Sequence, residues 1–108
     1  MYEIEAKRLK QNTEIMENTF KANDLKIMGF SVKAEEDGNC SFLIEISGGK
    51  IEECVSVKVN LYDSAGDVFD IKDVLVTESF GGYDALKLEF YDEKVFEKVV
   101  SARIYVVV

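Results

Sequence analysis

The sequence predicts a mainly β protein, an antiparallel β-sandwich of about six or seven strands with a short helix at its N-terminus. After Asp24, apolar residues recur at every second position and the β-formers Val, Ile, Phe and Tyr dominate. Short polar or glycine-containing turns separate these stretches, as is typical of sandwiches. The length of 108 residues and the 47% hydrophobic content suit one domain that folds around its own core.

The first twenty residues follow a helical pattern instead of a twofold one. Their larger side chains recur at spacings of three and four, which places them on one face of an amphipathic helix. Glu3 and Lys7 add an i,i+4 pair, and a leader or linker segment is the alternative for this region. We therefore divide the chain into residues 1–22, a helix or leader, and residues 23–108, the sandwich domain. The residues of the helical stripe are Tyr2, Ala6, Leu9, Thr13, Met16 and Phe20.

Two strands are predicted in the first half of the chain. The first, over residues 25–32, changes phase in its middle, because its apolar residues are odd-numbered before Gly29 and even-numbered after it. A β-bulge at Met28 or Gly29 would account for this change. The polar turn at residues 35–39 leads into the second strand, over residues 40–47.

A β-hairpin in the middle of the chain is the clearest local signal. Residues 55–62 alternate between aliphatic and polar side chains, as expected for a half-buried strand. Residues 63–66 suit a type I turn closed by a left-handed Gly66, and residues 68–77 return as the partner strand. The apolar phase changes within this returning strand, so we expect it to be bent or bulged in its middle.

The last part of the chain predicts two more strands, over residues 86–90 and 104–108. Residues 95–100 fit either a helical turn or a short strand. The chain contains no proline, so protection of the sheet edges must come from charged side chains. The lysines spread among the predicted strands are Lys26, Lys33, Lys58, Lys72 and Lys87.

The two cysteines predict no zinc or redox site, because they form no CxxC motif and the chain has no histidine. Cys40 falls in phase with the apolar Phe42 and Ile44, whereas Cys54 falls in phase with polar residues. We expect two free thiols with Cys40 buried, and a disulfide is the alternative.

Composition argues against several classes of function. The formal net charge of −8 repels phosphate backbones, so nucleic acid is not expected as a partner. Without histidine, no Ser-His-Asp or Cys-His arrangement exists, and the carboxylates are scattered, so we expect no enzyme activity, no catalytic residues and no cofactor. The chain has no apolar run long enough to span a bilayer, and its first ten residues are rich in charged side chains. These two features predict no membrane insertion and a cytoplasmic location. The alternative is a cell-surface or secreted location, if the sequence is a trimmed form that lacks its leader and anchor.

Acidic residues concentrate around the predicted hairpin, where Asp63 and Asp67 are candidate oxygen ligands for calcium. Their spacing does not match an EF-hand loop. A hydrated turn is the preferred interpretation, and we expect no bound metal.

The loop at residues 78–84 carries Phe80 and Tyr83 beside two glycines. Exposed aromatic side chains on a glycine-containing loop are typical of recognition surfaces, so these two residues are the candidate partner-binding site. The alternative is that both rings close one end of the sandwich as part of the core.

A resemblance to a known family rests on the run VSVKVNLYD at residues 55–63, followed by Gly66. This pattern resembles the FxLYD-type domains of bacteria and archaea, in which an alternating strand ends in Leu-Tyr-Asp before a glycine and a returning strand. The resemblance implies a small immunoglobulin-like sandwich. It also implies an accessory module, usually associated with the cell surface or envelope, without known enzyme activity or catalytic residues.

These features predict a non-enzymatic module that binds another protein or has a structural role, through its exposed strands or through Phe80 and Tyr83. The alternative function is a sensor domain that binds calcium or a small ligand. We expect a protein partner of unknown identity. The chain itself is predicted to be a monomer or a weak homo-oligomer, the latter through the N-terminal helix.

Overall fold

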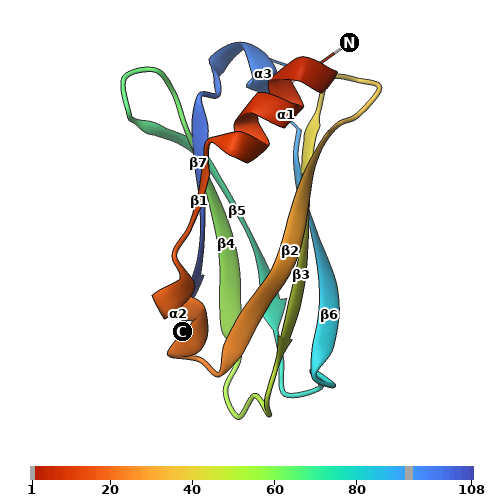
Figure 1. Ribbon diagram of the computed structural model, residues 1–108, viewed down its shortest axis with the longest axis vertical. Helices are drawn as coiled ribbons and strands as arrows, with labels where there is room; N and C mark the ends of the chain where they lie inside the picture. Colours follow the sequence, from red (N-terminus) through yellow and green to blue (C-terminus); the bar gives the residue numbers. More distant parts are fainter. Residues whose placement is uncertain (1, 92–93) are drawn as a thin grey trace.

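The computed structural model describes residues 2–91 and 94–108, which form three helices and seven strands in two packed sheets (Figure 1). In chain order the elements are α1 (Glu3–Gln11), β1 (Thr13–Ile15), α2 (Glu17–Lys21), β2 (Leu25–Ala34), β3 (Cys40–Gly48), β4 (Val55–Tyr62), β5 (Val68–Val76), β6 (Tyr83–Phe90), α3 (Val95–Lys98) and β7 (Ser101–Val107). One sheet has the strand order β1-β7-β4-β5 and the other the order β2-β3-β6. The predicted mainly β sandwich with a short N-terminal helix is confirmed.

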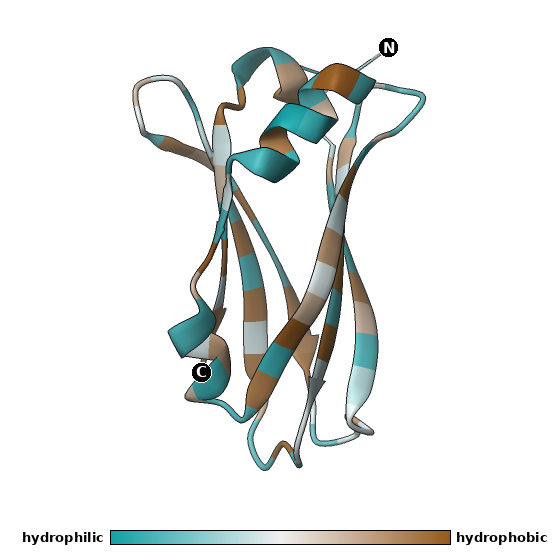
Figure 2. Ribbon diagram, in the orientation of Figure 1, coloured by the Kyte–Doolittle hydropathy of each residue, from teal (hydrophilic) through white to brown (hydrophobic). Residues whose placement is uncertain are grey.

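Hydrophobic and hydrophilic residues alternate along the strands (Figure 2). Along β4, buried residues alternate with half-buried ones over the whole strand. Phe42 of β3 packs edge to face against Phe90 of β6, with ring centroids 5.9 Å apart. Removal of this apolar surface from water is the main force that holds the sheets together. The largest fully buried side chains are Phe20, Phe42, Phe90, Ile44, Ile46, Leu61 and Ile104.

The N-terminal helix is shorter than the predicted stripe. α1 ends before Asn12, whose carbonyl accepts a hydrogen bond from the Ala102 amide at 3.2 Å, and the next residues run parallel to β7 as β1. A separate helix, α2, then buries Phe20, while Met16 remains 38% exposed. The prediction of one helix through Phe20 is wrong, because backbone groups at the edge of β7 bond this segment in place of further helical turns. The parallel pair β1 and β7 is also a departure from the expected antiparallel sandwich.

Both strands that were predicted to be irregular have a register shift, but only the shift in β2 lies where it was expected. The register of β2 on β3 shifts between Ile27 and Gly29, where a bulge was expected. By contrast, β5 pairs with β4 without interruption through its middle, and its register shifts only next to the hairpin turn, near Val68. An irregularity in β5 was predicted and exists, but its predicted position in the middle of the strand is wrong. Phe69 and Val74 differ in phase, yet both pack against the core, because Phe69 lies at the register shift. Ile71 points outward and is 47% exposed.

The remaining elements match the predicted order with shifted boundaries. The hairpin between β4 and β5 is confirmed, with Gly66 at φ 81° and the Asp63 amide donating to the Asp67 carbonyl at 3.0 Å. β6 and β7 each begin three residues earlier than predicted, and the undecided segment between them forms α3. None of the helices built by the described residues has the length and apolar composition needed to cross a membrane.

The two lateral sides of the sandwich are covered differently. On one side the edge strands β5 and β6 contact each other, and the ammonium nitrogen of Lys72 lies 5.9 Å from the centroid of the Tyr91 ring. On the other side, β2 contacts α1 towards one end and α2 towards the other, as Figure 1 shows. Below, the β5–β6 side is termed the closed side and the β1–β2 side the open side.

Candidate functional site

The structure places the two aromatic residues of the predicted binding site in different surroundings. Phe80 lies in the loop before β6, where it is half-buried and packs against the core. Tyr83 is the first residue of β6 and is 57% exposed. Its hydroxyl donates to Oε2 of Glu45 at 2.9 Å, and this bond raises the pKa of the Tyr83 phenol above its ordinary value. One ring therefore faces the core, and the other lies on the outer face of the β2-β3-β6 sheet.

In the acidic hairpin, the carboxylate of Asp63 stabilises the turn. Oδ1 of Asp63 accepts hydrogen bonds from the backbone amides of Ala65 and Asp67, both at 3.0 Å. Such bonds are the usual reason for aspartate at the first position of a turn. Across residues 2–91 and 94–108, no three His, Cys, Asp or Glu side chains are placed to share a metal ion. The geometry assigns Asp63 a structural role in the turn.

Both cysteines are free thiols, and Cys40 is buried, as predicted. Burial, with a smaller contribution from Glu35, raises the pKa of the Cys40 thiol to about 12. Because the thiolate is the reactive form, Cys40 is protonated and inert at neutral pH. Cys40 is part of the hydrophobic core, whereas Cys54 lies exposed just before β4.

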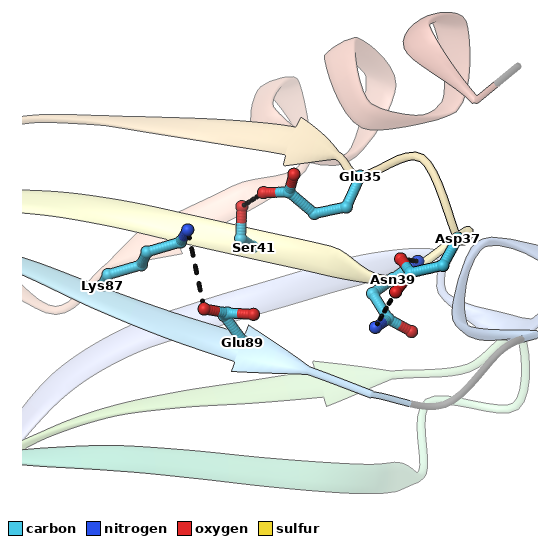
Figure 3. A network of polar contacts seen from close by, with 6 residues as sticks. All are labelled: Glu35, Asp37, Asn39, Ser41, Lys87 and Glu89. Atoms are coloured by element: carbon cyan, nitrogen blue, oxygen red, sulfur yellow. Dashed lines mark hydrogen bonds and ion pairs between the residues drawn. The ribbon is translucent and has the colours of Figure 1, made fainter.

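A polar cluster lies around the turn between β2 and β3 (Figure 3). The hydroxyl of Ser41, a buried residue, donates to Oε1 of Glu35 at 2.8 Å. On β6, the ammonium group of Lys87 lies 3.5 Å from Oε1 of Glu89. A satisfied buried hydroxyl avoids a desolvation cost, whereas a partly exposed ion pair contributes little. The bond between Glu35 and Ser41 therefore links the turn to β3. The groups of this cluster are not arranged like a catalytic site.

The open side carries two adjoining cavities of about 320 and 310 Å³, both lined by Glu17 and Ile27. Together they form a groove between β1, α2 and the edge of β2, here termed the β1–β2 groove. Its walls are mainly apolar, and the volume of each cavity is large enough to receive side chains of another molecule. The apolar residues that line it are Ile15, Phe20, Leu25, Ile27, Met28 and Phe30.

Positive charge surrounds this groove on an otherwise acidic protein. Lys10, Lys21 and Lys26 line it together with Glu17, which gives a local formal charge of +2 on a chain whose net charge is −8. All three lysines are exposed, and within the described part of the chain none has an ion-pair partner. The ammonium nitrogen of Lys10 lies 5.6 Å from the centroid of the Phe30 ring.

The groove could not be found from the sequence, because its residues come from α1, β1, α2 and β2, and the first three of these were expected to form one helix. The one available signal was the predicted bulge in β2. A bulge bends the strand edge, and the bulge residue Met28 lines the groove and is 56% exposed.

Comparison with known sequences finds neither a matching protein-family model nor a similar curated protein. Among solved structures, the fold is similar to that of the Campylobacter jejuni protein cj0090, with a TM-score of 0.52 and 16% identity over 88% of this chain and 95% of that one. At this identity the similarity concerns the fold alone. A β-glucosidase from Kluyveromyces marxianus matches with a TM-score of 0.31 and 12% identity over 78% of this chain and 13% of that one, which is too weak to support an inference. The FxLYD resemblance stays a prediction.

Proposed function

We propose that this protein is a non-enzymatic interaction module that binds an extended segment of another protein in the β1–β2 groove. The observation that carries the proposal is an apolar groove next to a strand edge, since among the described residues β2 has a strand neighbour only on its β3 side. A segment lying along β2 would pair with its free backbone groups. Alternate side chains of that segment would then point into the groove.

Charge favours a segment in which apolar residues alternate with Asp or Glu. The apolar residues would replace water against Ile27 and Phe30, while the acidic ones would meet the lysines at the groove margin. Because the net charge of the chain is −8, these lysines are a local exception to a field that repels acidic partners. Recognition of an acidic segment would therefore depend on them more than on overall attraction.

The closed side is less suited to strand addition. Its edge strand β5 carries Asp70, Lys72 and Asp73 in its middle, and charged residues on an edge strand oppose pairing with another chain. The exposed Ile71 and Leu75 lie on the outer face of the same sheet. The open side is the better docking surface because there an apolar cavity and a strand edge coincide.

The test is a titration of the whole chain, labelled at isoleucine methyl groups, with a short capped peptide of alternating valine and glutamate. We expect saturable shifts of the Ile15 and Ile27 signals. The matching valine and lysine peptide should bind more weakly by about tenfold, because the groove lysines repel it. If neither peptide shifts these signals, docking in the groove is wrong.

A matched pair of variants separates local from overall charge. Lys21→Glu/Lys26→Glu reverses the charge at the groove, and Lys33→Glu/Lys87→Glu makes the same change on the outer face of the β2-β3-β6 sheet. We expect the first to weaken binding of the glutamate peptide by about tenfold or more and the second to leave it nearly unchanged. An equal loss in both variants would contradict recognition by the groove lysines.

A further inference from the structure

A separate pocket of about 390 Å³ opens where β7 begins, between the end of α1 and the tip of the β4–β5 hairpin. Arg103 of β7 lines this pocket. In the sheet, Arg103 pairs with Glu14 of β1 on one side and with Asn60 of β4 on the other. Tyr62, Ser101 and other polar groups line the same pocket. None of these residues takes part in the β1–β2 groove, so the site is independent of the function proposed above.

The guanidinium group of Arg103 is held from two directions. Its Cζ lies 5.4 Å from the centroid of the Tyr62 ring, and its Nε lies 3.4 Å from Oε1 of Glu14. Nε is buried and makes no hydrogen bond of good geometry. Because the closest approach of Glu14 is to Nε, the two terminal nitrogens are left for another acceptor, and the Arg103 side chain is 43% exposed.

The aromatic support beneath the guanidinium group is itself fixed. The amide nitrogen of Asn60 donates to the Tyr62 hydroxyl at 3.1 Å, and the Tyr105 hydroxyl donates to Oδ1 of Asn60 at 2.8 Å. A planar cation placed over a hydrogen-bonded ring loses less further freedom when it binds a ligand than an unsupported one. The arginine is therefore preorganised for a planar, bidentate acceptor.

Two more donors lie at the pocket wall. The Asn12 side-chain amide and the Ser101 hydroxyl line the pocket and have no hydrogen-bond partner within the described residues. Their neighbourhood is rigid, because the Ala102 amide donates to the Asn12 carbonyl at 3.2 Å and the Val100 amide donates to the Tyr62 carbonyl at 2.8 Å. The side-chain donors of Asn12 and Ser101 are therefore available to a ligand in the pocket, on a backbone that is held in place.

We propose that this pocket binds a carboxylate of a small organic acid or of a peptide C-terminus. The terminal N–H groups of Arg103 donate to its two oxygens, and Asn12 and Ser101 donate from the side. The fork of a guanidinium group matches the spacing of carboxylate oxygens. A single negative charge suits the site better than a phosphate dianion, because Glu14 lines the pocket and the whole chain carries a net charge of −8.

The test is a titration of the whole ¹⁵N-labelled chain with acetate, with N-acetyl-glycylglycine, with the C-terminal amide of that dipeptide, and with inorganic phosphate. We expect saturable shifts of the Asn12, Ser101 and Arg103 amides with both carboxylates, with dissociation constants on the order of millimolar, and none with the amide. Stronger binding of acetate indicates a small acid as the ligand, and stronger binding of the dipeptide indicates a peptide terminus. Tighter binding of phosphate than of either carboxylate would overturn the assignment.

Three variants decide whether Arg103 carries the binding. Arg103→Gln should weaken acetate binding by about tenfold or more, whereas Lys58→Gln, which removes a positive charge from the same face of the sheet, should not. Glu14→Gln should tighten binding, because it removes a competing negative charge while the Tyr62 ring still supports the guanidinium group. Retained binding in Arg103→Gln, or weaker binding in Glu14→Gln, would show that the pocket is not a carboxylate site.

Discussion

The closed and open sides of the sandwich protect their edge strands in different ways. On the closed side, β5 carries Asp70 and Lys72 along its edge and contacts β6. On the open side, β2 has apolar residues such as Ile27 next to a cavity, and the edge of β2 that faces away from β3 is contacted by the helices α1 and α2. Charge protects one edge, and helices cover part of the other. The uncovered part of β2 is consequently the place where the proposed partner segment would pair.

The N-terminal segment creates this difference. α2 is tied to β7 because the Val106 amide donates to Oγ1 of Thr19 at 3.0 Å, and the Met16 amide donates to the Ile104 carbonyl at 2.9 Å. Its Phe20 is 1% exposed and lines the first of the two cavities. Residues 1–22 thus share the hydrophobic core of residues 23–108 and form one wall of the groove.

The largest expected effect comes from removing the anchor of the open side. Phe20→Ala leaves a cavity between α2 and β2, so the free energy of unfolding should fall by about 3–5 kcal/mol. Urea unfolding followed by circular dichroism measures this loss. Met16→Ala, in a neighbouring but exposed position, is the control and should cost less than about 1 kcal/mol. Equal losses would mean that α2 is not anchored in the core.

A smaller effect is expected at the hairpin that leads to the closed side. Gly66 has φ 81°, a left-handed conformation that strains any residue with a Cβ, so Gly66→Ala should lower the free energy of unfolding by about 1–2 kcal/mol. Gly81→Ala is the matched control, because Gly81 has no positive φ and no atom within 4 Å of an added Cβ. A larger loss at Gly81 than at Gly66 would contradict the assigned turn.

Removal of charge from the closed side should change association more than stability. Asp70→Asn/Lys72→Thr leaves the core intact, so the free energy of unfolding should change by less than about 1 kcal/mol. The neutral edge of β5 should then pair between molecules, and the mass measured by light scattering should rise with concentration. Lys58→Thr, on the central strand β4, should stay unchanged in mass. If the mass of both variants stayed constant, the hypothesis that charge protects this edge from pairing would be wrong.

The smallest effect concerns the outer face of the β2-β3-β6 sheet. Glu45→Ala removes the acceptor of the Tyr83 hydroxyl, so the pKa of Tyr83 should fall towards the ordinary phenol value of about 10. A raised pKa in the folded state means that this bond stabilises the fold below pH 10 or so, and that the gain is lost as pH rises through the raised pKa. Ring NMR signals followed against pH report the change, and an unaltered pKa in the variant would show that Glu45 is not its cause.

Local pattern was enough to predict most strands and the mainly β architecture. The alternation in residues 55–62 and the turn with Gly66 predicted the β4–β5 hairpin correctly, because both depend on residues close in sequence. Pattern misplaced the irregularity of β5, because it assigned the exposed Ile71 to the core while the register shift lies next to the turn. It also failed for the surfaces, since the groove and the Arg103 pocket each combine elements far apart in the chain.

The sequence by itself determined where the chain alternates, where it turns and that Cys40 is buried, because these properties follow from neighbouring residues. Only the tertiary structure decided that the chain leaves the helix at Asn12 and runs beside β7. That choice depends on backbone partners from the opposite end of the chain, such as Ala102, which no local period reveals. For the same reason, packing alone placed Lys21 and Lys26 beside one apolar groove and set Arg103 between Tyr62 and Glu14.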